Sequence, residues 1–167
     1  MKKLKIIVPF VFLSIIVFVL MSPKEKETPI YLSSFSFVNL EGEMTNINEY
    51  TGSPLVINFW ATWCSPCRRE MPLLNNIHTV NADKDLKVIG IAIDEIDLVR
   101  DFVNELGIEF PILVGQGEAY DLMNSLGNSS MTLPYTIYVE SDGLISWTKN
   151  TEIKFEDLDV LVGEKKL

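Results

Sequence analysis

The chain has 167 residues, of which 47% are hydrophobic, enough for one domain with a real core. Its formal net charge is −9. Three lysines, Lys2, Lys3 and Lys5, precede the first apolar run, and the remainder has 11 basic against 23 acidic residues, a charge of −12. Domains that bind nucleic acid present basic faces, so this balance argues against that class of function.

The N-terminus has the pattern of a targeting segment rather than of folded structure. Ile6–Met21 is an apolar run of 16 residues, interrupted only by Pro9 and Ser14. At ~1.5 Å per residue it spans ~24 Å, less than the ~30 Å of a bilayer core, a length that also suits a cleavable secretory signal. No small-x-small cleavage site follows this run, which favours an uncleaved anchor. Its lysines would lie on the cytoplasmic side of the membrane and the domain on the other side. The domain is therefore expected in a compartment where disulfides persist. The predicted division is a signal-anchor over 1–22, a linker over 23–30 and a domain over 31–167.

Ahead of the cysteines, the pattern predicts an N-terminal hairpin and a central strand. Alternating apolar residues indicate a strand within Tyr31–Leu40, and Glu41-Gly42-Glu43 forms a turn. Met44–Ile47 would pair back as a short second strand. Asn48–Ser53 is expected as a loop or a single turn that leads into Leu55–Trp60, an apolar run typical of a buried strand.

The two cysteines of the chain lie three residues apart, where this strand meets a helical pattern. The helix start offers unpaired N–H groups and the positive end of the dipole, which lower the pKa of a thiol in a Cys-x-x-Cys motif. Cys64 is predicted to be the attacking thiolate, and Cys67, one turn further in, the more buried thiol that resolves the mixed disulfide. Pro66 suits the first helical turn, where its missing N–H costs nothing. The apolar positions that continue the helix are Met71, Leu74, Ile77 and Val80.

Two other interpretations of the cysteine pair stand beside redox chemistry. Cys-x-x-Cys also begins zinc ribbons, but zinc usually takes four protein ligands, and this chain has no third cysteine and one histidine, His78. His78 lies about three helical turns beyond Cys67 and is expected on the helix surface. A purely structural disulfide is conceivable, although closing so short a loop constrains little of the unfolded chain.

Strands and helices alternate through the rest of the chain. The predicted elements are a strand over Leu86–Ile93, a helix from Ile96 to Leu106 closed by Gly107, a brief strand over Phe110–Val114, a short helix over Glu118–Leu126 stopped by Gly127, a hairpin of Tyr135–Val139 and Leu144–Trp147, and a closing helix over Phe155–Val162. This order predicts an α/β fold with a central mixed sheet flanked by helices.

The segment Phe59-Trp-Ala-Thr-Trp-Cys-Ser-Pro-Cys67 resembles the active-site signature of thioredoxin-like proteins. The following Arg68-Arg-Glu-Met-Pro72 is similar to the TlpA/ResA branch, the membrane-anchored thiol–disulfide oxidoreductases. This resemblance covers roughly Phe35 to the C-terminus and implies a thioredoxin-like fold with an N-terminal hairpin and an inserted βα segment. Cytoplasmic thioredoxins have a buried Asp five residues before the Trp-Cys pair, and this chain departs from them with Asn58, which cannot act as a base.

The resemblance also implies roles for residues around the cysteines. Glu70 matches an active-site acid of the TlpA/ResA branch and could accept the proton of Cys67 if partial burial raised its pKa. The bond between Leu133 and Pro134 is expected to be cis and to face the cysteines, leaving backbone groups free for an extended substrate. The predicted substrate contacts are Leu133 and Pro134 together with Trp63, Ser65 and Pro66. Pro72 is expected to kink the helix, and Trp60 to belong to the core.

The function implied is that of a thiol–disulfide oxidoreductase, anchored in a bacterial cytoplasmic membrane with its domain on the extracytoplasmic side, that works as a reductant. The implied substrate is a cysteine pair of an exported protein, such as an apocytochrome c or a copper-site subunit of an oxidase. The implied electron donor is an integral membrane thiol protein. No bound cofactor or metal is expected beside the redox-active cysteine pair. A reduction potential near the ~−120 mV of strong oxidants, rather than near the ~−270 mV of thioredoxin, would reverse the direction.

Three alternatives from other classes remain. A peroxiredoxin-like peroxidase shares this fold, but Ile57 and Ala61 occupy the Pro and Thr positions of its Pro-x-x-x-Thr-x-x-Cys signature. A copper-binding assembly factor of the same fold class uses Cys-x-x-x-Cys and a remote histidine, one spacer more than here. A non-catalytic binding module would tolerate loss of Cys64.

Overall fold

The computed structural model describes residues 28–81, 85–157 and 161. The predicted signal-anchor over 1–22 lies outside them, as does most of the linker over 23–30. Within the described ranges, none of the helices combines the length and the apolar composition that crossing a bilayer requires.

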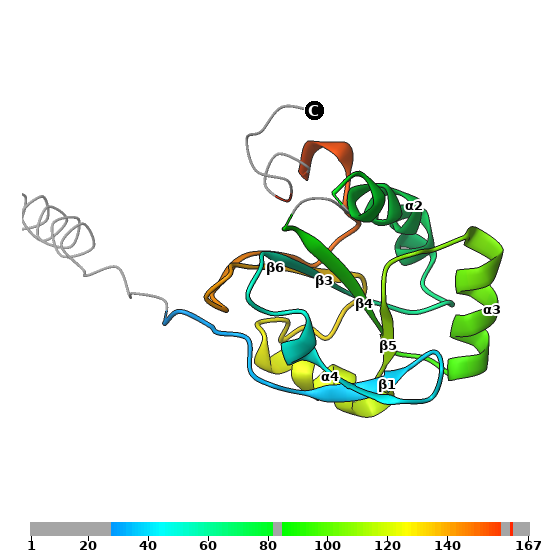
Figure 1. The fold of residues 1–167 in the computed structure, drawn as a ribbon, viewed down its shortest axis with the longest axis horizontal. Coiled ribbons are helices and arrows are strands. Elements are labelled where there is room, and N and C mark those ends of the chain that lie inside the picture. Colours follow the sequence, from blue (N-terminus) through cyan, green and yellow to red (C-terminus); the bar gives the residue numbers. More distant parts are fainter. Residues whose placement is uncertain (1–27, 82–84, 158–160, 162–167) are drawn as a thin grey trace, which may run out of the picture.

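One mixed sheet of seven strands forms the centre of the domain (Figure 1). Its order is β2-β1-β5-β4-β3-β6-β7, with β3, β4 and β5 mutually parallel and every other pairing antiparallel. This confirms the predicted mixed sheet and N-terminal hairpin. The strands are β1 (Ser36–Asn39), β2 (Met44–Asn46), β3 (Leu55–Trp60), β4 (Lys87–Ala92), β5 (Ile112–Val114), β6 (Tyr135–Val139) and β7 (Ile145–Lys149).

Helices cover both faces of the sheet, so that β3 and β4 are buried on both sides. Alternate residues of β3 serve the two faces: Trp60 packs with α2 (Ser65–Val80) and α3 (Ile96–Leu106), whereas Phe59 packs with α4 (Gln116–Ser125). A 3₁₀ turn, η1 (Ile47–Glu49), lies with α4. In Figure 1, α2 and α3 lie on one side of the sheet and α4 on the other.

Several element boundaries differ from those predicted. The first strand is only β1, because the chain ahead of it makes a single bridge, from Tyr31 to Leu144, rather than a ladder. The short second strand ends one residue early, where Asn46 caps η1 with its side chain. The closing helix predicted over 155–162 begins as a 3₁₀ turn, η2 (Phe155–Asp157), and residues 158–160 and 162 of that prediction lie outside the described residues.

The parallel strands β3, β4 and β5 all end at the same edge of the sheet, at Trp60, Ala92 and Val114. Their carboxyl ends form the edge on which open α/β sheets place their ligands. The cysteine motif follows β3 directly, so the fold positions it on this edge.

Candidate active site

Cys64 and Cys67 form a disulfide at the start of α2. Cys64 is the N-cap residue, and its Sγ accepts a hydrogen bond from the backbone N–H of Cys67 at 3.3 Å. The exposed fraction of Cys64 is 5%, and that of Cys67 is 0%. The more accessible cysteine is thus the one at the open helix end, where unpaired N–H groups stabilise an anion.

A side-chain clamp holds the turn that leads from β3 to Cys64. Asp94, just after β4, accepts hydrogen bonds at one carboxylate oxygen from the backbone N–H of Thr62 at 2.9 Å and from its hydroxyl at 2.5 Å. Cys64 donates its own N–H to the Ala61 carbonyl at 3.2 Å. These contacts fix the backbone on the N-terminal side of the disulfide.

Glu70 lies on the first turns of α2 and is 1% exposed. One carboxylate oxygen accepts a hydrogen bond from the Asn58 side-chain amide at 2.8 Å, and the other accepts one from the backbone N–H of Ile153 at 2.6 Å. Burial raises the pKa of Glu70 to about 7, against the lowering effect of these two hydrogen bonds. A carboxyl with that pKa exchanges a proton near neutral pH, as a general base for a thiol must.

The chain after β7 completes the surroundings of Glu70. Glu152 forms an ion pair with Arg69 on the exposed side of α2, next to Ile153, which is itself buried. Lys149 and Asp157 form a second, mostly buried ion pair at 2.6 Å. Residues 149–157 therefore pass against α2 and supply a hydrogen-bond donor to its buried acid.

The predicted cis bond between Leu133 and Pro134 is confirmed. Because Tyr135 pairs with Phe59 in the antiparallel β3–β6 ladder, the next step of this register places Pro134 opposite Trp60, at the end of β3 from which the chain turns to Cys64. Leu133 packs against the apolar cluster that contains both cysteines. The structure thus brings this loop to the edge of the sheet that holds the disulfide.

The remaining predicted site residues lie around Cys64 in the same turn. Trp63 is 64% exposed, whereas Trp60 is fully buried and packs on Phe102 with ring centroids 5.2 Å apart, as expected for a core residue. Ser65 is exposed and Pro66 half-buried. Their part in substrate binding stays a prediction.

His78 lies on α2, partly buried, and contacts Phe110 edge-on with ring centroids 6.3 Å apart. Burial lowers its pKa. Within residues 28–81, 85–157 and 161, no cluster of three His, Cys, Asp or Glu side chains is placed to hold a metal ion.

Pro72 lies inside α2 and leaves the Arg68 carbonyl without its helical N–H donor.

Sequence reasoning missed two contributors to the site. Asp94 directly follows a predicted buried strand, and residues in that position gather at the carboxyl edge of a parallel sheet, so a signal for it existed. Ile153 contributes through its backbone N–H alone, and its identity carries no corresponding signal.

Residues 31–148 match the AhpC/TSA family. Among similar proteins are the "Thiol-disulfide oxidoreductase ResA" of Bacillus thuringiensis (strain Al Hakam), 31% identical over 121 residues, and that of Halalkalibacterium halodurans, 32% identical over 113 residues. The matches cover 72% and 67% of this chain. They span 65% and 62% of the relatives, just under two thirds of their length.

Solved structures agree in fold. The thiol:disulfide interchange protein of the thioredoxin family from Chlorobium tepidum TLS superposes with a TM-score of 0.72 at 25% identity, covering 83% of this chain and 97% of that one. A secreted thiol-disulfide isomerase from Corynebacterium glutamicum gives 0.68 at 21% identity, covering 84% and 93%. The predicted thioredoxin-like fold and the resemblance to ResA-type proteins are therefore confirmed, and the chain belongs to the AhpC/TSA family.

Proposed function

We propose that this protein is a thiol–disulfide oxidoreductase that reduces cysteine pairs of exported proteins. The observation that carries the proposal is the Cys64–Cys67 pair at the open N-terminus of α2, with the more accessible cysteine at the cap position. The names of the ResA relatives describe the same reaction class and support it.

The reaction begins from the dithiol form. The Cys64 thiolate attacks one sulfur of the substrate disulfide, forms a mixed disulfide and releases the other substrate sulfur as a thiolate, which takes up a proton. Cys67, once deprotonated, attacks the Cys64 sulfur and releases the second substrate thiol. Two electrons and two protons pass to the substrate, and the enzyme is left with its Cys64–Cys67 disulfide.

Glu70 is proposed as the base that takes the proton of Cys67 before this second step. Both residues lie on α2 three positions apart, on the same side of the helix, and both are buried. The pKa of about 7 lets the carboxylate accept a proton at neutral pH and pass it on afterwards.

The proposal includes a place and partners for the enzyme. The lysines and the apolar run of residues 1–22 support a signal-anchor in a bacterial cytoplasmic membrane, with the domain on the extracytoplasmic side. The Corynebacterium glutamicum neighbour is a secreted protein, which agrees with that side. An integral membrane thiol protein would supply electrons, and apocytochrome c or an oxidase copper-site subunit would receive them.

Trapping of mixed disulfides tests the proposal. A Cys67→Ser variant, expressed with its N-terminal segment, should accumulate a disulfide between Cys64 and a substrate cysteine, visible as a reductant-sensitive band shift. Cys64→Ser is the matched control and should trap nothing. Equal activity of Cys64→Ser and the natural protein would indicate a non-catalytic module instead, and a potential near ~−120 mV would indicate an oxidant.

A further inference from the structure

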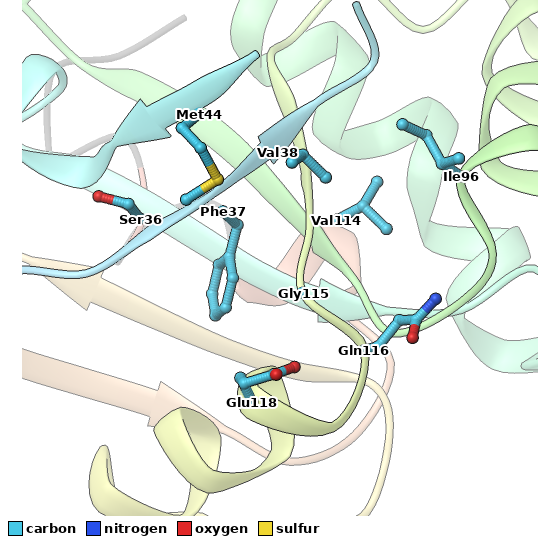
Figure 2. Close-up of a pocket in the computed structure, with 9 residues that line it drawn as sticks. All are labelled: Ser36, Phe37, Val38, Met44, Ile96, Val114, Gly115, Gln116 and Glu118. Atoms are coloured by element: carbon cyan, nitrogen blue, oxygen red, sulfur yellow. The ribbon is translucent and has the colours of Figure 1, made fainter. Parts of the chain in front are cut away.

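A groove opens on the same sheet edge as the disulfide, two strands away from it. Its walls come from the start of β1 and the end of β5, from β2 and from the first turns of α3 and α4, and its volume is about 410 Å³. Figure 2 shows the side chains around this β5 groove. Its apolar lining consists of Phe37, Val38, Met44, Ile96 and Val114.

The floor of the β5 groove is closely packed, while its outer wall is exposed. The Phe37 ring lies so close to Gly115 that a Cβ on that glycine would come within 2.8 Å of the ring. Met44, on the edge strand, is 67% exposed and borders the opening. An exposed methionine beside a closely packed apolar floor suits an apolar side chain of a partner, because the methionine thioether adapts to different shapes.

The charge around the β5 groove is mostly negative. Glu118 lines it, and Glu43 and Glu95 are exposed directly beside two lining residues. The sequence has no Lys or Arg from residue 28 to residue 67 or from 101 to 148, the stretches that form β1, β2, β5 and α4.

The basic residue of α3, Arg100, lies beside the groove, four positions after Ile96, but its guanidinium is already bonded within the protein. It donates hydrogen bonds to the Leu40 carbonyl and to Asp97, each at 2.7 Å. Among the described residues that line the β5 groove there is thus no cation to balance Glu118. A segment that brought its own Lys or Arg would complement this field.

We propose that the β5 groove is a docking site for the polypeptide substrate, and that it selects a segment with an apolar residue flanked by Lys or Arg near the cysteine pair. This inference rests on the proposed function and names its substrate class. Neighbouring strands lie about 4.8 Å apart, so β5 is about 10 Å from β3, a distance that about three residues of extended chain cover. The basic apolar stretch would therefore lie about three or more residues from the reacting cysteine.

A binding measurement tests the docking site without redox chemistry. The probe is a labelled, cysteine-free peptide with Leu between two Lys, and its counterpart has Glu in place of Lys. Fluorescence anisotropy with the oxidised protein should show tighter binding of the Lys peptide, weakened by salt. A Glu43→Gln/Glu118→Gln variant should weaken it by about three- to tenfold, the scale of two surface ion pairs.

Controls separate the groove from general acidity. Glu105→Gln removes one charge from an exposed position near the far end of α3, and should leave binding of the Lys peptide unchanged. Met44→Ser should weaken binding of the Lys peptide without altering its salt dependence. Equal binding of the Lys and Glu peptides, or an equal loss in Glu105→Gln, would overturn the proposal.

Turnover distinguishes this proposal from the proposed function. All three variants should reduce 2-hydroxyethyl disulfide at the natural rate, which also shows that they fold. With a cysteine pair added to the Lys peptide, the groove variants should lose kcat/KM by the same factor as affinity. Normal peptide binding without any disulfide reduction would refute the oxidoreductase and leave the docking site standing. Reduction of the peptide that is insensitive to the groove variants would refute the docking site alone.

Discussion

The side-chain amide of Asn58 on β3 donates to the Glu70 carboxylate on α2 at 2.8 Å, and also to the Thr136 hydroxyl on β6 at 2.9 Å. Asn58 stands where cytoplasmic thioredoxins carry a buried Asp. A neutral amide leaves Glu70 as the buried acid of this network, and the dominant effect of burial raises its pKa to about 7.

Glu70 makes stability depend on pH. Its folded pKa of about 7 lies above the ordinary value of 4.5, so the folded state binds more protons than the unfolded state between these values. The free energy of unfolding should therefore fall as pH rises from 4.5 through 7, by about 3 kcal/mol from this group. Urea unfolding of the oxidised protein at pH 5 and pH 8 measures the fall. In Glu70→Gln this fall in the free energy of unfolding should be smaller by about 3 kcal/mol. An equal fall in the variant and in the natural protein would contradict the raised pKa of Glu70.

Glu70→Gln should also slow the second chemical step. Without a base, the resolving thiol keeps its proton, and general-base loss costs on the order of 10²-fold in rate. Single-turnover quenching resolves this step, because the mixed disulfide should persist in Glu70→Gln. Glu105→Gln serves as control and should behave like the natural protein. An unchanged titration of Cys67 and an unchanged rate would remove Glu70 from the mechanism.

The Thr62–Asp94 clamp should contribute to stability. Thr62→Val keeps the shape and removes the hydroxyl donor to a carboxylate, which should cost about 1.5–3 kcal/mol in the free energy of unfolding. Asp94→Asn weakens the same contact. In a double-mutant cycle the two losses should be less than additive, and strict additivity would show that the clamp carries no coupling.

Gly90 on β4 has no room for a side chain. A Cβ there would lie 2.6 Å from Ile112 Cδ1 and 2.9 Å from the Trp60 indole nitrogen. Gly90→Ala should destabilise the domain by about 1–3 kcal/mol. Gly117→Ala is the matched control, because a Cβ added there would meet nothing within 4 Å and the residue sits in α4, where Ala is favoured. Thermal unfolding compares the two.

Peroxide turnover separates the oxidoreductase from a peroxidase of the same fold. Ile57 is buried within β3 and Ala61 in the turn after it, so neither supplies the Pro or the hydroxyl of the peroxidatic signature. With a thiol reductant and hydrogen peroxide, the purified protein should show no catalytic peroxide loss above the reductant alone. Sustained turnover abolished by Cys64→Ser would favour the peroxidase.

The sequence predicted the parts of this site that depend on chain-local patterns. The sequence predicted a disulfide at a strand-to-helix junction from the apolar run Leu55–Trp60 and the Cys-x-x-Cys motif after it. This was possible because the hydrophobic periods of strands and helices can be detected within a short stretch of sequence. The cis bond before Pro134 followed from the resemblance rather than from the pattern, since a proline alone does not specify its isomer.

What the sequence did not predict depends on pairing across the fold. Whether Glu70 is solvated or buried is decided by residues 149–157 passing against α2, a contact between segments about 80 positions apart. The contact of Asp94 with Thr62 likewise requires β4 to lie beside β3 in a given register. Local sequence patterns do not report contacts between residues that lie so far apart in the chain.

The backbone N–H of Ile153 has a practical consequence. Because Glu70 takes one of its two hydrogen bonds from a residue that follows β7, a truncation or a proteolytic cut after β7 should alter the surroundings of the proposed base, although it removes neither cysteine. Water would then reach Glu70 and return its carboxyl toward ordinary acidity. Shortened versions of the protein intended to keep its chemistry should therefore extend at least to Asp157.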